Sequence, residues 1–209
     1  MEQELKIGVL ALQGAFIEHI KMLRRLGAEA VEVRLPADLD GLDGLIIPGG
    51  ESTTIGKLAV MYNLMAPLEQ FARRKPVWGT CAGMIFMARD IGEPVNGRPQ
   101  PLLRLMDITV ERNAFGRQVD SFETGLDISV FTNGDTQPFP AVFIRAPRLV
   151  AAHGDAQVIA RLADGTAVAA QEGKWLVTSF HPELTDDLRF HNYFLRLVRA
   201  AQQKQAPVE

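Results

Sequence analysis

The amino-acid sequence predicts an α/β protein with three layers: a mostly parallel central sheet, helices on both faces, and antiparallel additions in the C-terminal half. Two patterns predict this fold class. Over residues 6–80, short apolar runs alternate with stretches of helical periodicity, which is typical of a parallel sheet covered by helices. Later in the chain, strand-like segments are separated by turn signals such as Asp164-Gly165 and Glu172-Gly173, which favour antiparallel pairing.

In the first half of the chain, apolar runs predict strands at residues 6–12, 31–35, 44–50 and 76–79. Apolar residues at helical spacing predict a helix from Phe16 to Leu26, with Gly27 as its C-cap. A longer helical stretch covers residues 53–74, with a break expected near Pro67. Ligands of parallel sheets bind at the carboxyl ends of the strands, so we expect a site there.

In the second half, strand-like segments lie at residues 105–111, 141–147, 156–162, 166–172 and 174–180. A final amphipathic helix carries apolar residues on one side, namely Phe190, Phe194, Leu197 and Val198. The sequence has no internal repeat, low-complexity tract or evident linker. We therefore expect one domain spanning residues 1–209, in which residues 203–209 form a flexible tail.

Composition excludes several classes of partner. The chain has 209 residues, of which 47% are hydrophobic and 22% charged, enough for one well-packed domain. Its net charge of −3 provides no basic field for nucleic acid or an anionic membrane. No apolar run approaches the roughly 20 residues of a membrane span, and one cysteine cannot form an internal disulfide. We therefore expect a soluble cytoplasmic protein that binds small molecules and protein surfaces.

The single cysteine lies in the stretch GTCAG, residues 79–83, which has the form G-x-C-x-G. This is the thiol counterpart of the G-x-S-x-G nucleophile elbow, where a strand turns sharply into a helix and leaves the nucleophile at the bend. Free backbone N–H groups at the helix start favour a thiolate and can bind an oxyanion. The alternative interpretation is that Cys81 is a small buried apolar residue at a tight turn.

A candidate base and a residue to orient it follow the last predicted strand, as His181 and Glu183. Residues two apart in an extended chain point the same way, so Glu183 can lie beside the His181 ring. With Cys81 as nucleophile, these residues can form a triad of the kind found in cysteine and serine hydrolases. The alternatives are a strand-end histidine beside a solvated glutamate, and a zinc site, for which further ligands at the usual spacing are lacking. The other histidines are expected to be structural or on the surface: His19, His153 and His191.

A glycine pair ends the third predicted strand, in the stretch PGGEST. Adjacent glycines let a ligand approach the main chain, so the amides of Gly49 and Gly50 are candidates for the second donor of an oxyanion hole. A structural interpretation is also open, in which Ser52 or Thr53 caps the helix that follows.

Taken together, these motifs resemble the class I, triad-type glutamine amidotransferases: a cysteine elbow after a strand, a glycine pair upstream of it, and His-Pro-Glu near the C-terminus. Further stretches narrow the resemblance to the glutaminase subunits of pyridoxal 5′-phosphate synthase complexes, namely ALQGAF (11–16), PGGEST (48–53), ERNAFGRQVDSFE (111–123), FIRAP (143–147) and SFHPEL (179–184). The resemblance runs from Lys6 to the final helix.

This resemblance implies an activity and a role for the triad residues. Cys81 would attack the side-chain carboxamide of L-glutamine, His181 would pass the proton to departing ammonia, and Glu183 would hold His181. Water would then hydrolyse the glutamyl thioester. No cofactor and no metal are expected.

The resemblance also implies which groups bind the oxyanion and the substrate. The oxyanion would be bound by the backbone N–H of Ala82 and by one from the loop at Gly49 and Gly50. Glutamine would be bound by residues at matching family positions, namely Gly50, Glu51, Ser52, Arg112, Ile144 and Arg145. A cation and several acceptors suit glutamine, which presents an α-carboxylate and an α-ammonium group.

Finally, the resemblance implies a partner. Ammonia released into water would be lost as ammonium, so the family's glutaminase docks on a (β/α)8-barrel synthase subunit, PdxS, in a large hetero-oligomer that makes pyridoxal 5′-phosphate. Gln13 matches a family position near this contact, and we expect low activity from the isolated chain. The alternatives are a glutaminase subunit for a different synthase, a cysteine hydrolase of another substrate, and a non-catalytic binding module on the same fold.

Overall fold

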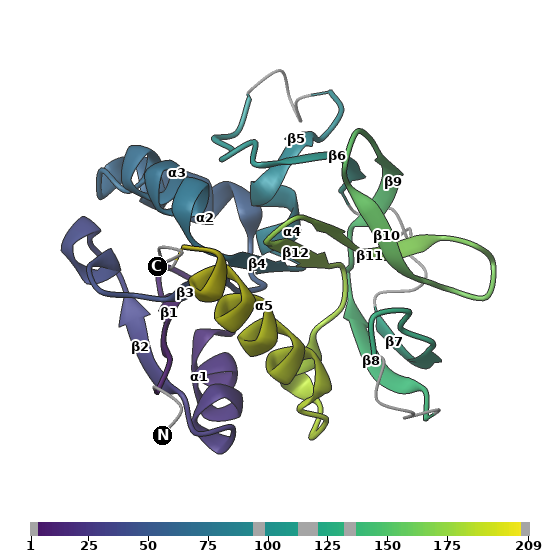
Figure 1. Ribbon diagram of the computed structural model, residues 1–209. Helices are drawn as coiled ribbons and strands as arrows, with labels where there is room; N and C mark the ends of the chain where they lie inside the picture. Colours follow the sequence, from purple (N-terminus) through teal and green to yellow (C-terminus); the bar gives the residue numbers. More distant parts are fainter. Residues whose placement is uncertain (1–3, 94–98, 113–120, 132–136, 206–209) are drawn as a thin grey trace.

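A computed structural model, which describes residues 4–93, 99–112, 121–131 and 137–205, confirms the predicted fold class. A central sheet lies between two layers of helices, and a small two-stranded sheet lies beside it (Figure 1). The strands are β1 (Lys6–Leu10), β2 (Glu29–Val33), β3 (Gly44–Ile47), β4 (Val77–Thr80), β5 (Ala88–Asp90), β6 (Met106–Glu111), β7 (Ser121–Leu126), β8 (Phe139–Ile144), β9 (Arg148–Ala152), β10 (Gln157–Arg161), β11 (Ala167–Glu172) and β12 (Trp175–Thr178). The helices are α1 (Phe16–Arg25), α2 (Ser52–Met61), α3 (Met65–Arg74), α4 (Ala82–Met87) and α5 (Arg189–Gln205), with short 3-10 turns η1 (Pro36–Leu39) and η3 (Pro182–Leu184).

The main sheet has ten strands in the order β2-β1-β3-β4-β12-β11-β9-β6-β5, with β10 paired to β11. From β2 to β12 all neighbours are parallel, and from β12 to β6 they are antiparallel. The last pair, β5 and β6, is parallel again. Strands β7 and β8 form the separate antiparallel pair.

Alternating strand residues divide the core into two clusters, one on each face of the sheet. Leu45, Ile47 and Val77 contribute to the cluster covered by α2, α3 and α4. Ile46 and Trp78 point the other way, into the cluster covered by α1, α5 and the β7–β8 pair. Because side chains alternate along a strand, this burial on both faces explains why the parallel strands are continuously apolar. Figure 1 shows α1 and α5 side by side over their face of the sheet.

The predicted elements are found near their expected positions, with corrections. The long helical stretch is broken at Asn63, which adopts a φ of 57°, and not at Pro67. Pro67 lies in the first turn of α3, where a missing N–H costs no helical hydrogen bond. The second strand ends at Val33, and Leu35 beyond it is 52% exposed.

Pairing in the second half also differs from expectation. Strand β12, expected as an antiparallel addition, pairs in parallel with β4 and so extends the parallel part of the sheet. Three strands were not predicted, namely β5, β7 and β9. Helix α5 continues to Gln205 and so includes residues 203–205 of the expected tail.

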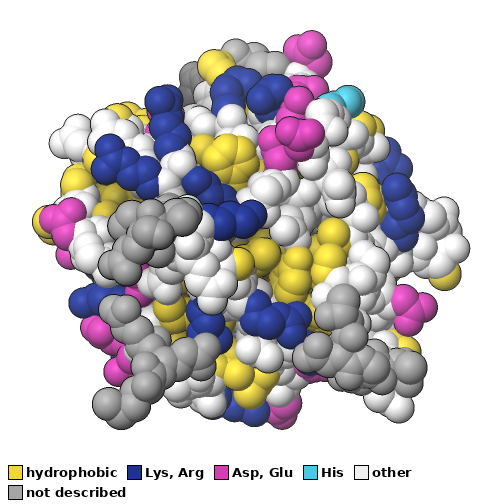
Figure 2. Space-filling model, in the orientation of Figure 1, with side chains coloured by type: hydrophobic (Ala, Val, Ile, Leu, Met, Phe, Trp, Pro, Cys, Tyr) yellow, Lys and Arg dark blue, Asp and Glu magenta, His cyan; other side chains and the backbone are white. Residues whose placement is uncertain are grey.

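The surface carries charges of both signs. Lys and Arg side chains are interspersed with Asp and Glu side chains on the face drawn in Figure 2, in keeping with the net charge of −3. Within the described ranges, none of the helices combines the length and apolar character that crossing a membrane requires.

Candidate active site

The candidate site lies at the carboxyl ends of four neighbouring strands. The loops that follow β1, β3, β4 and β12 carry Gln13, Gly49, Cys81 and His181, and these strands are adjacent and parallel in the sheet. Parallel strands end at one edge, so residues far apart in the sequence meet there. The chain order reverses between β1 and β3, which is where open α/β sheets bind ligands.

Cys81 lies in a strained turn between β4 and α4. Its φ of 47° and ψ of −103° are unfavourable for a residue with a side chain, and its amide donates to the carbonyl of Thr178 at 2.8 Å. A Cβ on Gly79 would come within 2.6 Å of the Gly83 backbone, and one on Gly83 within 2.1 Å of the Ile47 carbonyl oxygen. The two glycines therefore permit the turn, as expected of a nucleophile elbow.

His181 and Glu183 form a buried pair beside this turn. Nδ1 of His181 lies 2.7 Å from Oε1 of Glu183, and the residues are 7% and 5% exposed. The proximity predicted from the sequence is confirmed, but its cause is different: His181 caps the 3-10 turn η3, which begins at Pro182, and the chain is not extended. The amide of His181 donates to the carbonyl of Val142 on β8, at 2.8 Å.

The environment of His181 favours its protonated form. Burial alone would lower the pKa of the imidazole, but hydrogen bonds to Cys81 and Glu183, together with their charges, outweigh it and raise the pKa of His181 to about 10. The thiol and the carboxylate thus both act on one ring. With Nδ1 bonded to Glu183, Nε2 is the nitrogen available to Cys81.

The loop after β3 is held against the triad by the loop after β1. A Cβ on Gly49 would lie 2.4 Å from Cε1 of His181 and 3.3 Å from Cβ of Cys81, so only glycine fits at this contact. The carbonyl of Gly49 accepts from the amide of Ala15 at 3.1 Å. Oε1 of Gln13 accepts from the amide of Glu51 at 2.7 Å.

Glu51 is the N-cap of α2, in place of the expected Ser52 or Thr53. Its carboxylate accepts from the amide of Thr53 at 2.9 Å and from the amide of Thr54 at 2.7 Å. Burial opposes ionisation, but the hydrogen bonds from Thr54 and Thr53 outweigh it and lower the pKa of the Glu51 carboxyl. A carboxylate also suits the positive end of a helix dipole, which is why a residue longer than the usual caps serves here.

Arg112 reaches this region through a residue that the sequence analysis missed. Oε1 of Gln100 accepts from Nη1 of Arg112 at 2.5 Å, from Oγ1 of Thr53 at 3.2 Å and from Oγ of Ser52 at 3.4 Å. Gln100 thus joins Arg112 to the first turn of α2. No motif in the sequence singled it out, because its role depends on contacts across 47 or more residues to α2. Most of the motif 111–123 lies outside the described residues.

Ile144 is the last residue of β8, and Arg145 follows it directly. Ile144 is 37% exposed, and Arg145 adopts a positive φ of 43°. Val142, whose carbonyl binds the His181 amide, lies on the same strand. Strand β8 thus contacts the turn that carries Glu183, and Ile144 lies two residues beyond the carbonyl that binds the His181 amide.

His19 and His191, expected to be structural or on the surface, are fully buried behind the triad. Nε2 of His19 lies 3.4 Å from Oε2 of Glu183, and its Nδ1 lies 2.9 Å from Nε2 of His191. Since 172 residues separate the two histidines, no local pattern indicates the pair. His153 is exposed and contacts Thr109.

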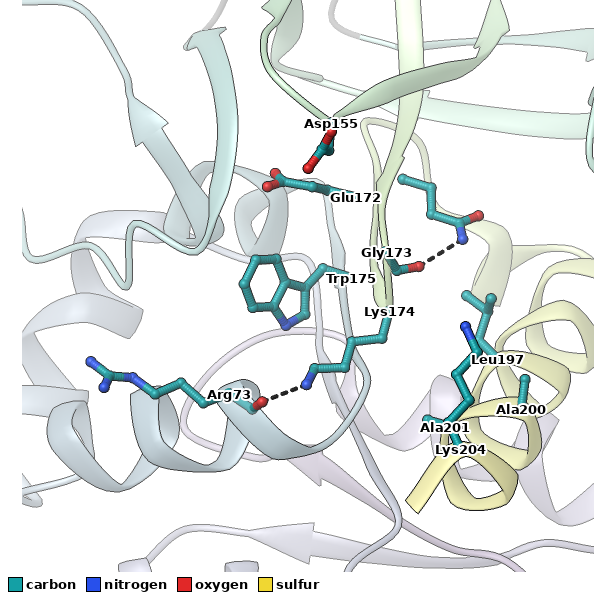
Figure 3. Close-up of a pocket in the computed structure, with 11 residues that line it drawn as sticks. Arg73, Asp155, Glu172, Gly173, Lys174, Trp175, Leu197, Ala200, Ala201 and Lys204 are labelled. Atoms are coloured by element: carbon teal, nitrogen blue, oxygen red, sulfur yellow. Dashed lines mark hydrogen bonds between the residues drawn. The ribbon is translucent and has the colours of Figure 1, made fainter. Parts of the chain in front are cut away.

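A cavity of about 720 Å³ lies elsewhere, at the start of β12. Figure 3 shows its lining, which includes Lys174 from the β11–β12 turn, Trp175 at the start of β12, and Leu197 and Lys204 from α5. These residues are at the amino end of β12, away from Cys81, so this cavity is not the candidate active site. No group of three or more histidine, cysteine or acidic side chains within the described ranges is placed to hold a metal ion.

The sheet order and the elbow at Cys81 define a class, the α/β proteins with a nucleophile elbow. The sequence model of the SNO glutamine amidotransferase family matches residues 9–200, and the chain belongs to this family.

Curated relatives and solved structures agree with this assignment. A protein of Dehalococcoides mccartyi named pyridoxal 5′-phosphate synthase subunit PdxT is 57% identical over 196 residues, covering 93% of this chain and 98% of the relative. A protein of the same name from Herpetosiphon aurantiacus is 57% identical over 193 residues, covering 91% and 99%. A crystal structure of a glutamine amidotransferase superposes with a TM-score of 0.84 at 48% identity, covering 92% of this chain and 98% of that one. A chain in the structure of PurLQS from Thermotoga maritima has a TM-score of 0.63 at 17% identity, covering 97% and 99%, and so shares the fold.

Proposed function

We propose that the chain is the glutaminase subunit of a pyridoxal 5′-phosphate synthase. It hydrolyses L-glutamine to glutamate and ammonia and passes the ammonia to a synthase subunit. The observation that carries the proposal is the strained Cys81 beside a His181 that is bonded to Glu183, in a chain that belongs to a glutamine amidotransferase family. The names of the curated relatives support the choice of synthase.

The reaction follows from the triad geometry. The sulfur of Cys81 attacks the carboxamide carbon of glutamine, and a C–S bond forms. His181 delivers a proton to the amide nitrogen, the C–N bond breaks, and ammonia leaves. Water, deprotonated by His181, then attacks the thioester, so that glutamate is released and the thiol is restored. Glu183 keeps the ring oriented and stabilises its positive charge throughout.

The surrounding backbone supplies the remaining groups. Ala82 follows Cys81 directly as the first residue of α4, and Gly49 lies against Cys81, so we assign the oxyanion to the amides of Ala82 and of the Gly49-Gly50 loop. Neither the two glycine amides nor that of Ala82 donates a backbone hydrogen bond within the described part of the chain. Free amides of this kind are what an oxyanion requires.

Substrate binding is assigned to the groups around this pocket. Arg112 and Arg145 provide cations for the α-carboxylate of glutamine, and the loop from Gly50 to Ser52 and Ile144 complete the binding site. The Gln100 contact supports this, because it holds Arg112 against the start of α2.

The partner is a (β/α)8-barrel synthase subunit, PdxS, in a hetero-oligomer. Gln13 lies in the loop that supports Gly49 and Glu51, so contact with a partner at this loop would act directly on the oxyanion site. We therefore assign Gln13 to the subunit contact, and the isolated chain is expected to release ammonia slowly.

The test is ammonia release from L-glutamine by the wild type and Cys81→Ala, each with and without the barrel subunit. Release by the wild type that depends on the partner supports triad, substrate and partner together. No release in any mixture would return Cys81 to the role of a buried turn residue. Full activity of the isolated wild type would support the glutaminase activity but contradict the requirement for docking on the partner.

A further inference from the structure

Two histidines that the proposed reaction does not use lie behind the triad, one on α1 and one on α5 (Figure 1). Both His19 and His191 are 0% exposed. Nδ1 of His19 and Nε2 of His191 are 2.9 Å apart, and both rings pack against Trp78, at centroid distances of 5.5 Å and 4.9 Å with near-perpendicular planes. The two rings are therefore held in fixed orientations by the core.

The inner end of this pair faces the triad carboxylate. Oε1 of Glu183 is bonded to His181, and Oε2 is buried without a hydrogen bond of normal geometry to any described residue. Nε2 of His19 lies 3.4 Å from Oε2 and 3.2 Å from Oγ1 of Thr80. A buried carboxylate oxygen with no donor is costly, so it matters whether Nε2 of His19 carries a proton that it can offer to Oε2.

The contacts favour one tautomer for each ring. If His19 carried its proton on Nδ1 and donated to His191, its bare Nε2 would face the carboxylate of Glu183, and lone pairs would repel. His191 would then carry a proton on its own Nδ1, which is buried and has no partner among the described residues. The opposite arrangement avoids both penalties: His191 donates from Nε2, and His19 presents Nε2–H to Glu183 and Thr80. A bare buried nitrogen is also cheaper than a buried N–H without an acceptor.

We propose that His19 is a positioning residue of the active site: its Nε2–H, held in that tautomer by His191, orients Glu183 through Oε2 so that Oε1 stays on His181. The proposal rests on the proposed glutaminase function for its kinetic consequence, but its structural part is independent of substrate.

Neutral rings suit this role better than a cation. Burial lowers the pKa of His19 well below its usual value, and the neighbouring His191 and His181 lower it further. Burial lowers the pKa of His191 to about 3. The neutral pair therefore offers Glu183 only an N–H dipole, and the negative charge of the carboxylate remains available to the His181 imidazolium. A protonated His19 would instead compete with His181 for that charge.

The first test uses the wild-type chain alone. Proton-nitrogen NMR correlation of histidine-labelled protein assigns the tautomer of each ring. We expect His19 and His191 to be neutral near pH 7, each with its proton on Nε2. A proton on Nδ1 of His19, or a charged His19, would overturn the proposal without any variant.

The second test compares His19→Gln with His19→Leu. Glutamine places an amide N–H close to the position of Nε2, and leucine fills similar volume without a donor. In the complex with the barrel subunit, we expect His19→Leu to lower kcat for glutamine about tenfold or more with little change in KM, and His19→Gln to stay within about threefold of the wild type. His153→Gln, at an exposed histidine, is the matched control for loss of an imidazole.

Equal kcat for the leucine and glutamine variants would contradict a role for the donor. The low-field Nδ1–H signal of His181 provides a readout without substrate: it should shift or broaden in His19→Leu and persist in His19→Gln. If wild-type protein releases no ammonia, the proposed function fails, yet this signal still decides whether His19 orients Glu183. If His19→Leu does not fold, the tautomer measurement and His19→Gln remain decisive.

Discussion

Nδ1 of His181 and Oε1 of Glu183 lie 2.7 Å apart across a single 3-10 turn that begins at Pro182. The turn places acceptor and ring in one buried unit, and Cys81 is the second group that acts on the ring. This unit is assembled before any substrate arrives, so its protonation can be measured in the free protein.

The first prediction concerns the proton on His181. Because its pKa is raised to about 10, the folded chain should keep the imidazolium through the range from pH 6.5 to about 10, where an unfolded histidine is neutral. NMR titration should therefore find a charged His181 ring at pH 8. Part of the shift comes from Cys81, so Cys81→Ala should lower the pKa of His181. A ring that is neutral at pH 8 in the wild type would contradict the paired geometry.

The second prediction concerns the contact of Gly49 with the triad. In Gly49→Ala, the new Cβ would lie 2.4 Å from Cε1 of His181, so the ring must move. A displacement of about 1 Å costs roughly a hundredfold in rate, and we expect a loss of ammonia release of that size.

The control for this substitution is Gly41→Ala, where a Cβ meets nothing within 4 Å but the backbone has a φ of +73°. That variant should lose about 1 kcal/mol of stability and keep its ammonia release. Comparable activity in the two alanine variants would mean that Gly49 does not set the position of His181.

The third prediction concerns strain at Cys81. Its φ of 47° and ψ of −103° cost about 1–3 kcal/mol for a residue with a side chain, whereas glycine adopts positive φ freely. Glycine loses more entropy on folding, by about 0.5–1 kcal/mol. We therefore expect Cys81→Gly to be more stable than Cys81→Ala by about 1 kcal/mol in denaturant unfolding. A more stable alanine variant would indicate an unstrained elbow.

The fourth prediction concerns Gln100. Its Oε1 joins Arg112 to Ser52 and Thr53, so Gln100→Ala should release Arg112 from the start of α2. If Arg112 binds the α-carboxylate, KM for glutamine should rise by roughly five- to tenfold with a smaller effect on kcat.

A matched control is Gln202→Ala, which removes a hydrogen bond to Asp43 far from this site. It should leave KM unchanged. An unchanged KM in Gln100→Ala would mean that Arg112 is positioned by other contacts or does not bind glutamine.

Local patterns in the sequence were sufficient to predict part of the fold and part of the candidate site. The parallel strands follow from apolar runs that are buried on both faces, and the elbow follows from Gly79 and Gly83 on either side of Cys81. The pairing of His181 with Glu183 could also be predicted, since the two residues are close in the chain, although a 3-10 turn and not an extended segment brings them together here. These features depend on neighbours within a few positions.

Only the tertiary structure decided the other features of the fold and the site, because those features depend on which distant segments of the chain become neighbours. Strand β12 pairs in parallel with β4, and this pairing brings His181 to the same carboxyl-terminal edge of the sheet as Cys81. Gln100 and the buried His19–His191 pair acquire their roles only through contacts that span from 12 to 172 residues. Burial removes water as the alternative partner of these two histidines, so their tautomers depend on the few polar groups that the fold places beside them.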